Sequence, residues 1–342
     1  MKGLDCGTGN YVAASKGNIK LQRNAFLTID KNPTTKKSLK RLNIPFVEIN
    51  NRVHVVGRHA YEYAQIFGNS ELRRPMASGL LNPKEQDALP VLRLIINDIL
   101  GKPEQDGELC VYCVPGKPID NEHFVDYHED VLKQLIESLG YKARALNEAE
   151  ALAFSGLTDD GLTGIAISMG AGMCNICIMY GGMSALNFSV ARGGDFIDQN
   201  TARDCAITPA KAQYVKEHMS AGIDQATKVV IQGGKAGIKE PAQLTREEQA
   251  VKTYYGVLIR YLLANIAKQF TESSDMPNFP NPVPIVVGGG TSMMPGFIDI
   301  FNEQFAQQEF PINISEIRQV DEPLTAVARG CLADAILEDE ED

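Results

Sequence analysis

The stretch LDCGTGNYVAAS, residues 4–15, contains a short apolar strand that ends at Asp5 and breaks into Gly7-Thr8-Gly9-Asn10. Glycines have no side chain, so they let backbone N–H groups approach an anion, and a neighbouring hydroxyl adds a further donor. The same residues also fit a simple hairpin turn between two strands. The rest of the chain has to decide between an anion-binding loop and a plain turn.

Size and composition indicate a packed globular protein. The chain has 342 residues, 44% of them hydrophobic, which is enough for two domains at roughly 150 residues each. The formal charge is −10, from 43 acidic and 33 basic residues, and this balance argues against general nucleic-acid binding, which needs a basic surface. Part of the acidic excess lies in residues 338–342, which we expect to form a solvated, disordered tail.

Targeting and membrane segments are not evident. No secretory signal precedes Asp5, and no apolar run approaches the roughly 20 residues that span a bilayer. The start MKGLD leaves no room for an amphipathic anchoring helix, and YAQIFGNS (63–70) is a poor candidate for membrane insertion. We therefore expect a soluble, cytoplasmic protein without a membrane anchor.

Two cysteine pairs, Cys110 with Cys113 and Cys174 with Cys177, have the spacing of metal-binding knuckles. Both pairs lie in strand-like runs, where side chains three positions apart point to opposite faces and do not converge on one metal. We expect the seven cysteines to be buried, reduced thiols. The five histidines show no ligand spacing such as HExxH, so the sequence predicts no metal site built from protein ligands.

Strand-like and helix-like segments alternate along the chain, which predicts layered α/β domains. Predicted strands cover 51–57, 108–115, 163–170, 175–181 and 283–290; predicted helices cover 86–101, 121–140, 194–206, 208–219, 247–270 and 295–307. In the segment 121–140, apolar residues from Phe124 to Leu139 recur at spacings of three and four, and Gly140 ends the helix. The apolar stripe at 254–265 is expected to be core rather than a ligand site.

Glycine-rich turns occur at three strand ends. A strand, a glycine turn and a second strand follow one another at 4–15 and again at 165–180, which divides the chain into halves of similar length. A third cluster, VVGGGTSMMPGF (286–297), follows a buried-looking strand and leads into a helix. This arrangement suggests two related domains that each offer a glycine turn to a shared cleft.

In order and context, these segments resemble the nucleotide-cleft signature of the actin, sugar-kinase and heat-shock chaperone ATPase superfamily. LDCGTGN resembles the first phosphate loop, NEAEALAFSGL (147–157) the first connecting helix, and ISMGAGMCNI (167–176) the second phosphate loop. VVGGGTSMMPG (286–296) resembles the adenosine turn, and DEPLTAVARGCLADA (321–335) the second connecting helix. The set is in family order, and the Walker-type GxxxxGK[ST] loop does not occur.

Within this superfamily, the sequence is similar to the bacterial actin-like filament proteins, MreB and especially MamK. VHVVGRHAYEYAQIFGNSELRRPMASGLL (53–81) resembles their stretch that runs through a helix to RPM and a glycine, and CVYCVPG (110–116) resembles the strand that enters their next helix. RGGDFID (192–198) resembles the turn after their second phosphate loop, and YVKEHM (214–219) the helix whose lysine and acid border the nucleotide.

The resemblance implies an actin-like, ribonuclease H-like fold, in which duplicated α/β domains, each a mixed β-sheet flanked by helices, surround a nucleotide cleft. Domain I would span 1–147 with a small subdomain at about 20–80, and domain II would span 148–320 with a small subdomain at about 208–275. Residues 321–337 would form a C-terminal helix that returns to domain I, followed by the acidic tail 338–342.

The resemblance also implies ATP and Mg²⁺ as cofactors and assigns roles to residues. Asp5 would hold Mg²⁺ through water, and Glu148 would position the attacking water, so these two form the catalytic set. Backbone amides of 7–10 and 170–173 would clamp the phosphates from opposite domains without a Walker lysine. The residues implied in nucleotide binding are Gly7, Thr8, Gly9, Asn10, Gly170, Ala171, Gly172, Met173, Gly194, Asp195, Lys216, Glu217, Gly288, Gly289, Gly290 and Thr291.

Plainer interpretations of the same residues exist. Glu148 also suits the first turn of a helix, whose dipole favours acids. Lys216 and Glu217 also fit a solvated surface pair, and Asp195 and Asp198 also fit the first turn of the helix after Gly193-Gly194. The ordered set of five motifs is what favours the functional roles.

Ser168 departs from the family pattern, because the second phosphate loop usually carries an aspartate there. A hydroxyl cannot supply the negative charge that orients the water shell of the metal, so the sequence predicts slow hydrolysis. Nucleotide binding depends on the amide loops and is less affected.

These features favour an ATP-binding cytoskeletal protein that polymerises with nucleotide and organises cell components. Its partners would be further copies of itself and a cargo or adaptor protein. A small-molecule kinase of the same superfamily and a non-polymerising ATP-binding scaffold stay open. A chaperone is disfavoured because the chain ends shortly after Ala335, without a substrate-binding β domain.

Overall fold

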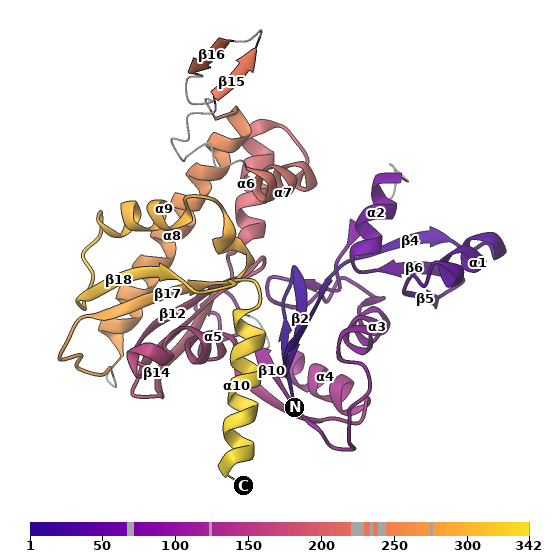
Figure 1. Ribbon diagram of the computed structural model, residues 1–342, viewed down its shortest axis with the longest axis horizontal. Coiled ribbons are helices and arrows are strands. Elements are labelled where there is room, and N and C mark those ends of the chain that lie inside the picture. The colour runs from indigo at the N-terminus through magenta and orange to yellow at the C-terminus, as the bar shows by residue number, and fades with distance from the viewer. Residues whose placement is uncertain are drawn as a thin grey trace.

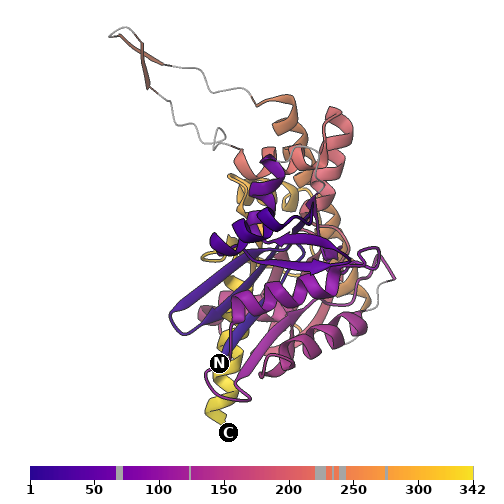
Figure 2. The same cartoon turned by 90° about the vertical axis from the view of Figure 1, so that its right-hand side faces the viewer.

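A computed structural model describes residues 1–66, 72–122, 125–219, 229–232, 235–238, 244–273 and 276–341. The described residues form two α/β halves, and the last helix, α10 (Ala326–Glu341), runs between them (Figure 1). Seen from the side, the N-terminus and the end of α10 lie at the same end of the molecule (Figure 2).

The first half is built on a five-stranded mixed sheet in the order β11-β10-β1-β2-β3. Its strands are β1 (Lys2–Cys6), β2 (Asn10–Ser15), β3 (Asn18–Arg23), β10 (Leu109–Val114) and β11 (Lys142–Asn147). β1 pairs antiparallel with β2 and parallel with β10. Helices α3 (Ala88–Leu100) and α4 (Val125–Glu137) bury their apolar stripes against this sheet, where Leu92 and Leu132 are fully buried.

A smaller sheet with two helices of its own extends the first half (Figure 1). Its sheet has the order β5-β6-β4-β7, formed by β4 (Phe26–Asp30), β5 (Phe46–Ile49), β6 (Arg52–Val56) and β7 (Leu72–Arg73), next to helices α1 (Pro33–Arg41) and α2 (Arg58–Ile66). A short hairpin, β8 (Met76–Ala77) and β9 (Leu80–Leu81), precedes α3, and Met76 packs into the core of the first half. The side chain of Asn32 caps α1, and Pro33 follows at the first helical position.

The second half repeats the topology of the first. Its five-stranded sheet has the order β14-β13-β12-β17-β18, with β12 (Gly164–Met169), β13 (Cys174–Tyr180), β14 (Met183–Val190), β17 (Val283–Gly288) and β18 (Ile314–Gln319). β12 pairs antiparallel with β13 and parallel with β17, as β1 does with β2 and β10. This match confirms the predicted duplicated, mixed-sheet fold.

The helices of the second half include α6 (Gly194–Cys205), α7 (Pro209–His218), α8 (Arg246–Glu272) and α9 (Phe297–Phe305). α6, α8 and α9 bury apolar side chains against the sheet. A hairpin of β15 (Val229–Gln232) and β16 (Lys235–Ile238) and the short turns Thr158–Asp160 and Gly290–Met293 complete the described elements. The predicted core stripe of α8 is buried, including Leu258 and Leu262.

Two helices join the halves. α5 (Glu148–Gly156) and α10 pack together, and their apolar side chains contact strands of both sheets, from Val111 of β10 to Ala166 of β12. The packing is close at Gly330, where an added Cβ would lie 1.7 Å from the carbonyl oxygen of Ala151. These helices occupy the positions predicted for the two connecting helices.

Each predicted strand and helix is present within a few residues of its expected ends. All seven cysteines are free and buried, and Cys110 and Cys113 lie in different core clusters, as do Cys174 and Cys177, because the strands turn them to opposite faces. Phe124, from the predicted stripe of the helix 121–140, lies outside the described residues.

One expectation is wrong. Residues 338–341 are not a disordered tail, because α10 continues to Glu341. Glu338 forms an ion pair with Arg144 at 2.6 Å and lies 3.9 Å from Lys142. These contacts join α10 at Glu338 to β11. No helix in the described part of the chain has the length and apolar character needed to cross a membrane.

Candidate functional site

A cavity of about 500 Å³ lies between the two halves. Its walls include the ends of central strands and the turns that follow them: 5–10 from β1 onward, Ser168 of β12 with 170–173, and 289–291 and 293–295 after β17. Helices α6 and α7 close a further side. The volume is within the range of sites that bind small molecules.

The first two glycine turns have the same geometry in both halves. Gly7 N–H donates to the carbonyl of Asn10 at 3.0 Å, and Gly170 N–H donates to the carbonyl of Met173 at 2.9 Å. The tips of the turns meet across the cavity, where a Cβ on Gly172 would lie 2.6 Å from Thr8 Oγ1. Glycine is required at this close approach.

The same turns leave main-chain donors at the cavity wall. Within the described parts of the chain, no oxygen accepts a hydrogen bond from the backbone N–H of Thr8, Gly9, Ala171 or Gly172. Clustered N–H groups of this kind bind anions. The pair of turns is therefore suited to hold phosphate groups from two sides.

Two half-buried carboxylates, Asp5 and Glu148, line the cavity. Burial and the nearby charge of Glu148 raise the pKa of Asp5 to about 8, against an opposing hydrogen bond from the Cys113 thiol at 3.4 Å. Burial also raises the pKa of Glu148, and hydrogen bonds from Ser168 and Asn175 oppose that rise. Removal from water disfavours the charged form of both groups.

This donor set fits a hydrated magnesium ion. A divalent cation beside Asp5 and Glu148 would favour their ionised forms. Among the described residues, no three or more His, Cys, Asp and Glu side chains form a group that could hold a metal. Mg²⁺ bound here would use one or two carboxylates, waters and substrate phosphates, as it commonly does in phosphoryl-transfer sites.

The side chain of Lys216 is mostly shielded from solvent. Its Nζ donates to Asp198 Oδ2 at 2.6 Å and to the carbonyl of Gly194 at 3.0 Å, and its side chain is only 10% exposed. Burial raises the pKa of Asp198 to about 6 although Lys216 lowers it. Lys216 therefore joins α7 to the start of α6, and its interpretation as an ordinary surface pair with Glu217 is wrong.

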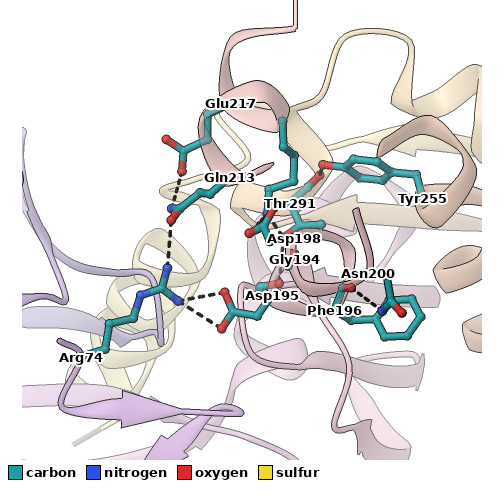
Figure 3. A network of polar contacts seen from close by, with 12 residues as sticks. Arg74, Gly194, Asp195, Phe196, Asp198, Asn200, Gln213, Glu217, Tyr255 and Thr291 are labelled. Carbon is teal, nitrogen blue, oxygen red and sulfur yellow. Dashed lines mark hydrogen bonds and ion pairs between the residues drawn. The ribbon is translucent and has the colours of Figure 1, made fainter. Parts of the chain in front are cut away.

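Thr291 links the third glycine cluster to the turn 170–173. Its Oγ1 donates to the carbonyl of Gly170 at 2.8 Å. The Tyr255 hydroxyl donates to the carbonyl of Thr291 at 2.9 Å (Figure 3). Tyr255 lines the cavity as well as the core. One residue of the predicted core stripe thus also belongs to the site.

Ion pairs cross the cavity from the first half to the second. Arg74 contacts both carboxylate oxygens of Asp195, at 2.8 and 3.1 Å, and Gln213 at 3.2 Å (Figure 3). Gln213 in turn donates to Glu217, which pairs with Arg23 at 3.1 Å. Two arginines of the first half therefore contact α6 and α7 of the second.

The structure brings most of the predicted site residues together. Asp5, Glu148, residues 7–10 and 170–173, Asp195, Lys216, Glu217, Gly289, Gly290 and Thr291 all line the cavity. Gly194 lies just behind, with its carbonyl bound to Lys216. Gly288 does not border the cavity, because it faces α5, where an added Cβ would lie 2.6 Å from Leu152 Cδ1.

Sequence reasoning missed several lining residues. These are Leu21, Arg23, Arg74, Gly79, Gln213, His218, Met293, Met294, Pro295 and Leu324. Arg74 lies in the RRPM segment that carried the family resemblance, and Met293 to Pro295 lie in the third glycine motif. Their motifs were visible, but the sequence gives no sign of which side chains face the cavity.

Solved structures similar to the chain cover nearly its whole length. The MamK double helical filament is 20% identical, with a TM-score of 0.71 and 98% of each chain covered. MreB5 of Spiroplasma citri bound to AMPPNP is 16% identical, with a TM-score of 0.63 and coverage of 99% of this chain and 97% of that one. The ethanolamine utilization protein EutJ from Carboxydothermus hydrogenoformans is 14% identical, with a TM-score of 0.54 and coverage of 98% and 89%.

Together with the duplicated sheets and the cavity between them, these similarities define the chain as a protein of the actin-like fold, as its motifs predict. A family model described as Volactin matches residues 1–335. The chain belongs to the Volactin family. None of the curated proteins compared with it matches it in sequence.

Proposed function

We propose that this chain binds a magnesium–ATP complex between its two halves, hydrolyses it slowly and assembles into filaments. The observation that carries the proposal is the pair of matching turns, 7–10 and 170–173, which leave amides unpaired at one cavity that also holds two half-buried carboxylates. Such a site offers phosphate binding from both halves at once, so the bound nucleotide favours their closed arrangement.

In this proposal, individual residues have separate roles. The amides of Gly9 and Gly172 bind phosphate oxygens, Asp5 holds the water shell of the metal, and the metal neutralises phosphate charge. Glu148 accepts a hydrogen bond from the attacking water and aligns it with the terminal phosphate. The apolar wall of Met293, Met294, Pro295 and Leu324 provides a surface for the base.

Filament formation is supported by the fold of the related structures. MamK is described as a double helical filament, and MreB5 and a non-polymerising MamK mutant are described as bound to AMPPNP. Repeated head-to-tail contacts that do not close into a ring give an open filament. We further propose that this homopolymer acts in the cytoplasm and positions other cell components through a cargo or adaptor protein.

Sedimentation and negative-stain electron microscopy with Mg–ATP, with Mg–AMPPNP and without nucleotide test this function. We expect filaments with Mg–ATP and with Mg–AMPPNP, and no filaments without nucleotide. Glu148→Gln keeps a hydrogen-bonding side chain of the same length, so it should bind nucleotide and polymerise but hydrolyse about 100-fold more slowly. Binding without polymer would favour the scaffold alternative, and phosphorylation of a small molecule would favour the kinase.

A further inference from the structure

Ser168 occupies a position that carries an acid in the family pattern, yet it has a specific partner here. Its Oγ donates to Glu148 Oε1 at 2.7 Å, and its side chain is almost fully buried. Glu148 is the first residue of α5, and Asn147 caps that helix by accepting from Ala149 N–H and Glu150 N–H. The serine thus contacts the proposed water-positioning group directly.

Asn175 lies beside Ser168 in the sheet and counteracts the rise in the pKa of Glu148. It lies opposite Ser168 in the antiparallel register of β12 and β13, so the two side chains share one face of the sheet. Gly116 N–H donates to Asn175 Oδ1 at 2.9 Å. The amide oxygen is therefore occupied, and the NH₂ group is the part that can donate to Glu148.

The polar residues around Glu148 also come from both halves of the molecule. Gly116 follows β10 of the first half, whereas Ser168 and Asn175 belong to the second. Gly116 packs closely on β14, where an added Cβ would lie 2.8 Å from the carbonyl carbon of Phe188. Residues of both halves therefore contribute to the surroundings that position Glu148.

An aspartate at position 168 would suit this environment poorly. Asp5 and Glu148 already place two carboxylates in a buried region, and a third within hydrogen-bonding distance of Glu148 would repel it. A hydroxyl group instead donates a hydrogen bond to one carboxylate oxygen of Glu148. The serine therefore contributes a donor that an ionised aspartate lacks.

We propose that Ser168 and Asn175 are positioning residues that hold the Glu148 carboxylate in place for hydrolysis, so that Ser168 supports the reaction rather than merely lacking the acid of the family pattern. This inference rests on the proposed ATPase function. It reverses the expectation from the sequence, in which Ser168 only weakens hydrolysis.

Three variants test it: Ser168→Ala removes the donor, Ser168→Thr keeps a hydroxyl, and Ser168→Asp installs the family residue. Single-turnover ATP hydrolysis should fall about tenfold in Ser168→Ala, stay near wild type in Ser168→Thr, and not rise in Ser168→Asp. The affinity for Mg–AMPPNP, measured by calorimetry, should be unchanged in Ser168→Ala because the amide loops are intact. Circular dichroism melting checks that each variant folds.

Crystal structures of the wild type and Ser168→Ala provide a readout that does not require hydrolysis. We expect the Glu148 carboxylate beside Ser168 in the wild type and turned away or in two rotamers in the variant. An unchanged Glu148 rotamer in Ser168→Ala, a Ser168→Ala rate equal to that of the wild type, or a faster Ser168→Asp would each overturn the inference. A wild type that hydrolyses no ATP would defeat the proposed ATPase, and the structures alone would then decide whether Ser168 positions Glu148.

Discussion

At the scale of single residues, His128 is the clearest source of acid sensitivity. It lies on α4 and is 1% exposed, and neither ring nitrogen has a hydrogen-bond partner among the described residues. Burial lowers its pKa to about 4, compared with about 6.5 in an unfolded chain. The folded protein therefore keeps His128 neutral over a range in which the unfolded chain binds a proton.

This difference between the folded and unfolded pKa of His128 determines how the free energy of unfolding changes with pH. Because the folded pKa is lowered, the free energy of unfolding is unaffected above pH 6.5 and falls as the pH drops towards 4, by about 3 kcal/mol in total from this group. His128→Leu should remove that share of the pH dependence. Urea denaturation followed by circular dichroism at pH 7, 5.5 and 4.5 measures it.

A matched control is His218→Leu, which changes an exposed histidine on α7. It should keep the wild-type dependence of unfolding free energy on pH. If His128→Leu lost stability with acid as steeply as the wild type, burial of a neutral His128 would not be the cause.

The sequence alone predicts the surroundings of some side chains and not those of others. The buried, free cysteines follow from strand alternation, which fixes the direction of each side chain. The partners of Arg74 and Ser168 do not follow from local pattern, because Asp195 and Glu148 are brought to them by the fold. A long-range contact of this kind leaves no periodic signal in the sequence.

At the scale of elements, the crossing of α5 and α10 depends on Gly330. An added Cβ would lie 1.7 Å from the carbonyl oxygen of Ala151 and 2.5 Å from its carbonyl carbon. Gly330→Ala must therefore separate the two helices, and we expect it to lower the free energy of unfolding by about 2 kcal/mol or more. Differential scanning calorimetry would show this as a lower Tm.

Gly256→Ala is the matched control, since it makes the same substitution inside helix α8. There the atoms nearest to an added Cβ belong to Gln304, the first of them at 3.5 Å, which is ordinary van der Waals contact. Alanine is favoured over glycine within a helix by roughly 0.5–1 kcal/mol, so this variant should be neutral or more stable. Equal Tm values for the two variants would contradict the close crossing of α5 and α10.

Element positions were largely predictable because apolar spacing separates helices from strands. α3, α6, α8 and α9 all begin and end within a few residues of their predicted ranges. The extent of α10 was not predictable, because the contacts of Glu338 near its end are with Arg144 and Lys142, from a strand far away in the sequence. A run of acids with no nearby bases is otherwise typical of a disordered tail.

At the scale of the whole molecule, two arginines of the first half join the two halves across the cavity: Arg74 pairs with Asp195 (Figure 3) and Arg23 pairs with Glu217. Arg74 binds Asp195 through one guanidinium nitrogen and Gln213 through another, so its removal breaks two contacts. Arg74→Ala should favour opening and speed the release of a fluorescent ATP analogue by about tenfold. Stopped-flow displacement by excess ATP measures that rate.

Salt and a control variant sharpen this test. Added NaCl should speed nucleotide release from the wild type more than from Arg74→Ala, because screening weakens ion pairs that the variant lacks. Arg318→Ala removes ion pairs with Asp160 and Glu316 within the second half and should leave release unchanged. Equal release rates for the wild type and Arg74→Ala would show that these contacts do not hold the cleft closed.

The duplicated architecture was predictable from the order of three glycine turns, since each follows an apolar strand. What the order could not show is that turns 7–10 and 170–173 meet at one cavity, with Gly172 against Thr8. That juxtaposition requires the two sheets to be packed by α5 and α10, whose contacts are not local in sequence.

The central claim is that these facing turns bind one nucleoside triphosphate per chain. Isothermal titration calorimetry with Mg–ATP measures it most directly, using an Ala171→Trp variant to fill the cavity and an exposed Leu42→Trp variant as the control. We expect one site per chain in the wild type and in Leu42→Trp, and no binding in Ala171→Trp. The absence of any heat of binding with Mg–ATP or Mg–GTP, or equal binding by Ala171→Trp, would contradict the account.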